Sequence, residues 1–299
     1  MTVTTSGMGK PPLRVIAGPT ASGKSARALA EARATDGVII NADASQLYRD
    51  LPILTAQPDA EAMAAVPHRL YGVLDAAEVA SAARWAVLAT AEIEAAWAHG
   101  QLPVLVGGTG LYLRTLLEGI APVPAIPADV RAEVRALPAP AVRAALARED
   151  PAMAARLHPG DPQRNARALE VIRATGRSLA EWQRAPRTGG IGHRAAVDAV
   201  VLAPPPEVLH ARITQRIAAM LAAGAIDEVR ALAARDLPAD RPILRAIGVP
   251  PLLAHIRGET SEAEAVARWE QDTRRYAKRQ ATWFRTQAPG WLRDGGAGS

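Results

Sequence analysis

The sequence predicts an α/β protein in which a parallel sheet is flanked by helices and carries an inserted all-helical subdomain. Three observations lead to this fold class. Apolar strands alternate with helical segments over the first third of the chain, which is typical of a parallel sheet. A proline-rich segment, 122–127, ends this alternation, and only helical patterns follow it. A further strand, Val197–Ala203, then returns the chain to the sheet. We therefore divide the chain into a first core part, 1–121, an insertion, 122–190, and a second core part, 191–299.

The elements are expected in the following order. In the first core part, strands are predicted at Leu13–Ala17, Val38–Asn41 and Leu102–Val106, and helices at Ser25–Arg33 and Ser81–Ala98. In the insertion, a helix should begin at Asp161-Pro162, because aspartate is a good N-cap and proline is accepted in the first turn. It should end at Thr175, with Gly176 as its C-cap. The last strand is followed by predicted helices at Glu207–Ala222, Ala225–Ala234 and Ser261–Gln287.

Composition limits the class of protein. The chain has 299 residues, of which 49% are hydrophobic, and this is enough to bury a sizeable core. It has no run of 18 apolar residues, and residues 1–10 lack the apolar segment of a secretory signal, so we expect no membrane association. The absence of cysteine excludes disulfides and thiolate metal sites and is typical of cytoplasmic proteins. A net charge of +5 is compatible with an RNA partner.

A phosphate-binding loop follows the first strand. Residues 18–25 have the pattern G-x-x-x-x-G-K-S, in which backbone N–H groups surround a phosphate. The predicted phosphate or diphosphate ligands are Gly18, Pro19, Thr20, Ala21, Ser22, Gly23, Lys24 and Ser25. Lys24 adds a positive charge, the Ser25 hydroxyl suits Mg²⁺, and the next helix points its positive end at the anion. Kinases, ATPases and transferases all use this loop, and a glycine-rich turn without a ligand is the alternative.

Two other strand ends carry polar residues. Asp43 follows the strand at 38–41, and Thr109 follows the strand at 102–106 within a glycine-rich turn. The carboxyl ends of parallel strands face one crevice, so both residues are expected beside the phosphate loop. Asp43 could hold Mg²⁺-bound water or accept a proton from an attacking nucleophile, whereas a helix or turn cap is the alternative.

Arg216 is predicted to point inward. It falls within the apolar stripe that Leu209, Ile213, Ile217 and Met220 form at helical spacing. A guanidinium in such a place needs an anion. A diphosphate leaving group would serve, and so would an internal aspartate or glutamate.

Two helices present candidate RNA-binding edges. Gln163, Arg164 and Arg167 share one edge of the helix that begins at Asp161, where they could read bases or hold phosphates, or form an ordinary solvated face. On the last helix one side carries Trp269, Tyr276, Gln280 and Trp283, and the other carries Arg274, Lys278 and Arg285. Such a basic ridge suits an RNA backbone but also occurs without nucleic acid.

Lysine is scarce in this chain. Besides Lys24, it occurs only at Lys10 and Lys278, and the rest of the 35 lysine and arginine residues are arginine. Lys278 is therefore a hypothetical site where a compact ammonium is required, and a leftover surface lysine is the alternative.

Taken together, the motifs resemble those of the tRNA dimethylallyltransferases. The similarity runs from about Val15 to Arg285. The segments that carry it are GPTASGKS at 18–25, NAD at 41–43, QLYR at 46–49, TA at 55–56 with Pro58, PHRL at 67–70, VGGTGLY at 106–112, DPQRNARALE at 161–170, 224–230, and YAKRQ at 276–280. Each segment is modest alone, but the ordered set is specific.

The resemblance implies a P-loop NTPase-like core, an inserted domain that grips the anticodon stem-loop, dimethylallyl diphosphate as donor and Mg²⁺ as metal. The acceptor would be N6 of the adenosine 3′-adjacent to the anticodon, position 37, in tRNAs that read codons starting with U. Asp43, Lys24 and Arg216 would be catalytic, with Asp43 accepting the proton and Ser25 binding the metal. The implied tRNA contacts are Asp43, Ala44, Ser45, Gln46, Thr109, Arg131, Gln163, Arg164, Asn165, Ala166 and Arg167. We expect a cytoplasmic monomer.

Four residues depart from the family pattern: Ala44 replaces serine, Leu54 glycine, Gln57 lysine and Val249 tyrosine. We interpret these changes as weaker secondary contacts, and a paralogue with another acceptor is the opposite interpretation. A P-loop kinase for a small metabolite and a non-catalytic RNA-binding module with a vestigial loop are the alternative functions.

Overall fold

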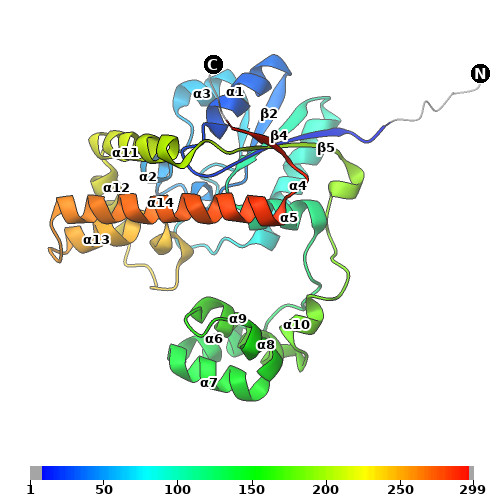
Figure 1. The fold of residues 1–299 in the computed structure, drawn as a ribbon, viewed down its shortest axis with the longest axis vertical. Helices are drawn as coiled ribbons and strands as arrows, with labels where there is room; N and C mark the ends of the chain where they lie inside the picture. Colours follow the sequence, from blue (N-terminus) through cyan, green and yellow to red (C-terminus); the bar gives the residue numbers. More distant parts are fainter. Residues whose placement is uncertain (1–8, 296–299) are drawn as a thin grey trace, which may run out of the picture. The chain divides into compact units, whose positions relative to one another are not determined.

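The structure is a computed structural model that describes residues 9–295. Its sheet has six parallel strands in the order β3-β2-β4-β1-β5-β6. The strands are β1 (Pro12–Ala17), β2 (Gly37–Asn41), β3 (His68–Arg69), β4 (Leu102–Gly107), β5 (Ala196–Leu202) and β6 (Leu292–Asp294). The predicted parallel sheet flanked by helices is confirmed (Figure 1).

The chain forms two compact units. Among the described residues, one unit contains 9–117 and 191–295, and the other contains 118–190. The first holds α1 (Lys24–Ala34), α2 (Pro52–Thr55), α3 (Ala60–Ala65), α4 (Ala82–Ala98), α5 (Gly110–Glu118), α11 (Pro206–Ala222), α12 (Ala225–Ala233), α13 (Val249–Ile256) and α14 (Glu262–Gln287). The second holds α6 (Ala128–Ala136), α7 (Ala139–Glu149), α8 (Pro151–Arg156), α9 (Pro162–Thr175) and α10 (Leu179–Trp182).

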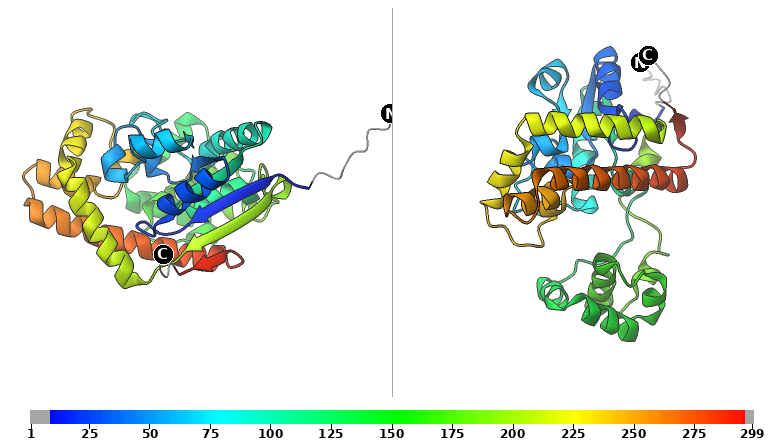
Figure 2. Two further views of the ribbon diagram at one scale, coloured as in Figure 1. Left: turned by 90° about the horizontal axis from the view of Figure 1, so that it is seen from above. Right: turned by 60° about the vertical axis from the view of Figure 1, so that its left-hand side comes forward.

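Two apolar layers cover the sheet. On one face, Ile16 and Val104 of the sheet pack against Ala28 and Ala32 of α1. On the other face, the buried strand residues join a larger core with α4, α5, α11 and α14. Figure 2 shows α11 and α14 side by side in both views. Burial of both faces explains why β2 and β4 are nearly continuous apolar runs.

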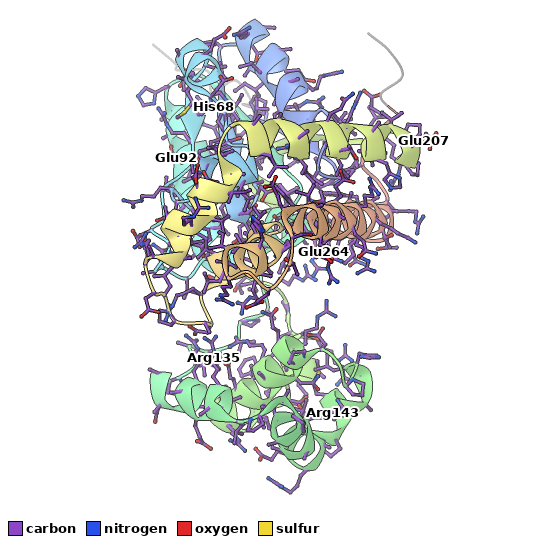
Figure 3. The ribbon with its side chains drawn as sticks, turned by 90° about the vertical axis from the view of Figure 1, so that its left-hand side faces the viewer. His68, Glu92, Arg135, Arg143, Glu207 and Glu264 are labelled. Carbon is purple, nitrogen blue, oxygen red and sulfur yellow. The ribbon has the colours of Figure 1, made fainter. Side chains whose placement is uncertain are left out.

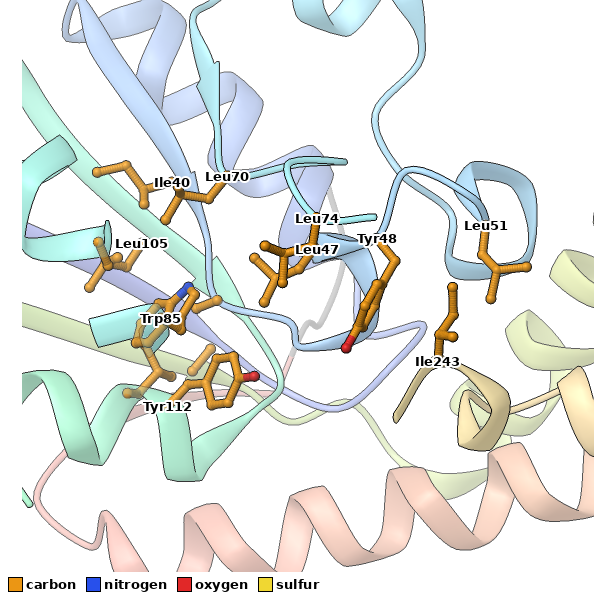
Figure 4. Packing of buried hydrophobic residues seen from close by; sticks show 14 of the residues in the cluster. Ile40, Leu47, Tyr48, Leu51, Leu70, Leu74, Trp85, Leu105, Tyr112 and Ile243 are labelled. Atoms are coloured by element: carbon orange, nitrogen blue, oxygen red, sulfur yellow. The ribbon is translucent and has the colours of Figure 1, made fainter. Parts of the chain in front are cut away.

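The larger core also fixes the end of β2. The rings of Trp85 and Tyr112 are stacked with 4.9 Å between their centroids (Figure 4). The Trp85 Nε1–H donates to the Asn41 carbonyl over 2.8 Å. Helix α4 therefore holds Asn41, the last residue of β2, two positions before Asp43.

The helix ends follow the known preferences for N-cap and C-cap residues. In the helical unit, the Asp161 side chain accepts from the Arg164 N–H, and Gly176 adopts the left-handed conformation after Thr175, as predicted. In the core, Ser261 and Glu264 form a capping box at the start of α14. Figure 3 shows Glu264 there and Glu207 in the first turn of α11. The strands β3 and β6 and the helices α2, α3 and α13 were not predicted.

Candidate active site

The carboxyl ends of three neighbouring strands build the site. Ala17 of β1 lies opposite Gly107 of β4, and Asn41 of β2 lies opposite Val106 of β4. The loops that leave β1, β2 and β4 therefore begin at nearly the same level. The phosphate loop, Asp43 and Thr109 are thus neighbours at one edge of the sheet, as predicted.

The phosphate loop leads directly into α1. Gly23 adopts φ 93°, a left-handed conformation that favours glycine, and acts as N-cap without a side-chain hydrogen bond. The first turn of α1 has no acidic residue. The positive end of α1 is therefore not neutralised by its own sequence, and it can receive an anion.

Lys24 lies where the loop meets the cavity. Its ammonium donates to the Pro19 carbonyl over 3.3 Å. Burial lowers the Lys24 pKa to about 8, and the Arg216 charge lowers it further while Asp43 opposes the change. The cations Lys24 and Arg216 thus both lie near one carboxylate, Asp43. Such an excess of positive charge should attract a diphosphate.

Asp43 is positioned by Asn41, which is fully buried. The Asn41 Oδ1 accepts from the Asp43 N–H over 2.8 Å, and its Nδ2 donates to the carbonyls of Asp43 and Leu70. The Asp43 Oδ1 accepts from both the N–H and the hydroxyl of Ser45. Asp43 therefore does close a turn, but within residues 9–295 its Oδ2 has no hydrogen bond and stays available to a substrate.

Arg216 lies in the predicted apolar stripe, since Leu209, Ile213, Ile217 and Met220 are all buried. Burial lowers the Arg216 pKa, and the Asp43 charge opposes that change. Across the described part of the chain, Arg216 forms no direct ion pair, and Asp43 is the carboxylate whose charge acts on it. Arg216 therefore has Asp43 as an internal electrostatic partner, and its guanidinium can also bind a ligand.

Thr109 links two of the loops. Its hydroxyl accepts from the Ala44 N–H over 3.1 Å. The strand ends can approach because position 107 is glycine: a Cβ there would lie 2.1 Å from the Ala42 carbonyl oxygen. Thr109 therefore connects β4 to the segment that carries Asp43.

A cavity of about 370 Å³ joins these groups, which is within the usual size range of small-molecule sites. Its polar lining includes Thr20, Lys24, Ser25, Asp43, Ser45, Gln46, Arg216, Tyr276 and Arg279. A second cavity of about 420 Å³ adjoins it, and both are lined by Lys24, Ser25, Gln46 and Arg216. The second has an apolar wall that includes Leu29, Ile39 and Val106.

The candidate RNA contacts lie in both units, and each set is described separately. In the core, Ala44, Ser45 and Gln46 line the first cavity. In the helical unit, Arg131, Gln163 and Arg164 are exposed, while Ala166 and Arg167 are partly buried. Arg167 lies 3.4 Å from Glu170.

Asn165 was expected to contact tRNA, but its side chain is buried. Its side chain is 1% exposed, accepts from Arg143 over 2.9 Å and donates to the carbonyls of His158 and Asp161. Figure 3 labels Arg143 on α7 of this unit. Asn165 therefore ties α9 to α7 and does not present its side chain to RNA, because it falls on the apolar side of α9.

The last helix has the predicted two sides. Trp269 and Gln280 are buried, and Tyr276 lines the cavity. Lys278 is exposed and lines neither of the two described cavities at the site.

The residues that depart from the family pattern have the following surroundings. Leu54 and Val249 are buried, and the Gln57 amide donates to the Tyr48 carbonyl over 2.8 Å.

Sequence reasoning assigned no individual role to Asn41, Gln280 or Glu228. The Glu228 carboxylate accepts from the N–H groups of Ile53 and Leu54, each over 2.8 Å, and so holds α2 at the cavity wall. These roles depend on contacts between distant segments. The signals for Gln280 were its place on the same helix side as Tyr276, one turn away, and its place in the family segment YAKRQ at 276–280.

Within 9–295, no cluster of three or more histidine, cysteine, aspartate or glutamate residues could hold a metal ion. No helix of that range has the length and hydrophobicity needed to cross a bilayer.

Comparisons with known proteins give a consistent result. A family model described as IPP transferase matches residues 46–287. The tRNA dimethylallyltransferase of Sphingopyxis alaskensis is 56% identical over 278 residues, covering 93% of this chain and 90% of that protein. The one from Azorhizobium caulinodans is 53% identical over 288 residues, covering 95% and 92%.

Solved structures are similar over most of the chain. The tRNA isopentenylpyrophosphate transferase of Bacillus halodurans has a TM-score of 0.69 and 34% identity, covering 95% of this chain and 90% of that one. A eukaryotic dimethylallyltransferase acting on tRNA has a TM-score of 0.77 and 26% identity, covering 92% and 70%.

Proposed function

The chain belongs to the IPP transferase family, and we propose that it transfers a dimethylallyl group from dimethylallyl diphosphate to tRNA. The acceptor is N6 of the adenosine 3′-adjacent to the anticodon, position 37, in tRNAs that read UNN codons, and diphosphate is released. One observation carries this proposal: Asp43, Lys24, Ser25 and Arg216 line a single cavity. That cavity offers a proton acceptor beside a set of groups suited to a diphosphate.

Asp43 would act on the acceptor. The exocyclic amine of adenine is a weak nucleophile because its lone pair is delocalised into the ring, and the base must leave its stack to reach the cavity. The Oδ2 of Asp43 would accept a hydrogen bond from N6 and then its proton. As the N6–C1 bond forms, the bond between C1 and the diphosphate oxygen breaks.

Lys24, Arg216 and the loop N–H groups would stabilise the departing diphosphate. The negative charge on the leaving group grows in the transition state, so cations that already lie in place act on that state most strongly. The lowered Lys24 pKa agrees with this role, because an anion would restore the charged form of a lysine that burial disfavours. The adjoining apolar cavity offers space for the hydrocarbon part of the donor.

Mg²⁺ fits the groups present. Ser25 contributes a hydroxyl oxygen and Asp43 a carboxylate at the same cavity, and Mg²⁺ prefers such oxygens together with phosphate oxygens and water. When bound, Mg²⁺ would neutralise charge on the diphosphate. We propose that Ser25 holds it.

The RNA would be held from both units. In the core, Ala44, Ser45 and Gln46, which line the cavity, would contact the flipped base together with Thr109, whose hydroxyl accepts from the Ala44 N–H. In the helical unit, Arg131, Gln163, Arg164 and Arg167 would contact the anticodon stem-loop, whereas the buried Asn165 would support them. We further propose that the protein acts in the cytoplasm as a monomer. The alternative of a small-metabolite kinase is not favoured by the relatives.

The test is nucleoside mass spectrometry of a UNN-reading tRNA incubated with the protein, Mg²⁺ and dimethylallyl diphosphate. Wild-type protein should yield N6-dimethylallyladenosine, and Asp43→Asn should lose the product because an amide cannot take the proton. Absence of product with wild-type protein would overturn the proposed function. Equal rates for both proteins would overturn the role of Asp43 alone.

A further inference from the structure

Gln280 of α14 connects the phosphate loop to the turn after β4. Its side chain is 5% exposed. Its Oε1 accepts from the Thr20 N–H over 2.9 Å, and its Nε2 donates to the Gly108 carbonyl over 3.0 Å. Thr20 lines the cavity and Gly108 precedes Thr109. One buried side chain thus joins two of the three loops that build the site.

An amide suits this place for a chemical reason. Thr20 offers a donor and Gly108 an acceptor, so the bridging group must accept at one atom and donate at another. A glutamate carboxylate could accept but not donate, and a methionine of similar length could do neither. Either substitution leaves a buried backbone group without its partner.

The contact between α14 and this turn is close along its whole length. A Cβ at position 108 would lie 2.0 Å from the Gln280 Nε2, and a Cβ at position 110 would lie 2.1 Å from the Trp283 ring. The helix therefore contacts this turn at the residues on both sides of Thr109.

We propose that Gln280 is a positioning residue for the transfer reaction, because its amide fixes the spacing between the phosphate loop and the Thr109 turn. Thr109 in turn accepts from the Ala44 N–H, next to Asp43. A change at Gln280 would therefore alter the alignment of the donor, held by the loop, with the acceptor, held near Asp43. This inference rests on the proposed function.

The first test compares Gln280→Met with Gln287→Met. Gln287 lies on the same helix and forms only surface contacts, among them one with Arg114. Misplacement by about 1 Å can lower a rate on the order of a hundredfold. For Gln280→Met we expect kcat per folded protein to fall roughly ten- to a hundredfold, while KM for dimethylallyl diphosphate changes less than about threefold. Gln287→Met should match wild type. A kcat for Gln280→Met equal to that of Gln287→Met would overturn the proposal.

Amide hydrogen exchange gives a readout that does not require activity. The Thr20 N–H is held by Gln280, so exchange in a peptide covering residues 18–22 should accelerate in Gln280→Met and stay unchanged in Gln287→Met. Unchanged exchange in both would overturn the inference even if the wild-type enzyme is active. Faster exchange with an inactive wild type would instead mean that the bridge exists and the proposed function is wrong.

A second variant, Gln280→Glu, tests the same bridge if Gln280→Met does not fold. A protonated carboxyl group has the amide's donor and acceptor pattern, so it can make both hydrogen bonds, whereas the carboxylate can only accept. The ratio of variant to wild-type kcat should therefore rise as the pH falls. A ratio that does not change with pH would contradict the bridging role.

Discussion

Lys24 should lower the free energy of unfolding of the protein, because its charge is buried. Burial moves its pKa from 10.5 to about 8. At about 1.36 kcal/mol per pKa unit, charged Lys24 destabilises the fold by on the order of 3 kcal/mol at neutral pH. The substitution Lys24→Met keeps the length of the side chain and removes the charge. We therefore expect the variant to be more stable than wild type near pH 7, although its transfer rate should fall by about a hundredfold or more.

The pH dependence has a definite sign. Between about pH 8 and 10.5, Lys24 is deprotonated in a larger fraction of the folded molecules than of the unfolded chains. The unfolded chain therefore binds more protons in this range. The Lys24 contribution therefore raises wild-type stability as the pH rises through that window. Lys24→Met lacks this contribution, and the stability difference between the two proteins should shrink by about pH 10.

Urea unfolding at pH 7 and at about pH 9.5 measures both effects. Tryptophan fluorescence is a suitable signal, because five of the six tryptophans, all except Trp182, lie in the core unit. The exposed Lys278 provides the control, since Lys278→Met should change stability little at either pH. If Lys24→Met is less stable than wild type at pH 7, the reasoning about burial is refuted.

Three further predictions concern other parts of the site. Asp43→Asn should lower kcat by about a hundredfold or more without altering the far-UV circular dichroism spectrum. Burial raises the Glu228 pKa, so the folded state binds more protons above pH 4.5 and the Glu228 contribution to stability declines as pH rises through the raised pKa. Urea titrations should show this decline in wild type and not in Glu228→Gln. Arg164→Ala should weaken tRNA binding and reduce the salt slope by about one, measured by filter binding from low to high salt.

The parts of the site that lie on the sheet could be predicted from the sequence. Lys24, Asp43 and Thr109 each follow a buried strand, and the parallel arrangement places such ends together. Arg216 could be placed because its own helix carries a regular apolar stripe. In these cases the signal lies within one element and its immediate loop.

Other features depend on contacts that sequence periodicity does not contain. The bridge from Gln280 to Thr20 spans 260 positions, and the two ends have no common local pattern. The strands β3 and β6 have two and three residues, too few to show alternation. Asn165 was expected to contact tRNA because it belongs to the family segment at 161–170, yet its position on α9 faces the apolar core of the helical unit.

Counting two products in one reaction tests directly whether the protein transfers a dimethylallyl group to the adenosine at position 37. Diphosphate release and dimethylallyl incorporation should be measured together on two transcripts of a UNN-reading tRNA, one with adenosine and one with guanosine at position 37. We expect equal amounts of both products with adenosine and neither product with guanosine, in the absence of ATP. Diphosphate release without incorporation, or phosphate transfer from ATP to a small molecule, would contradict it.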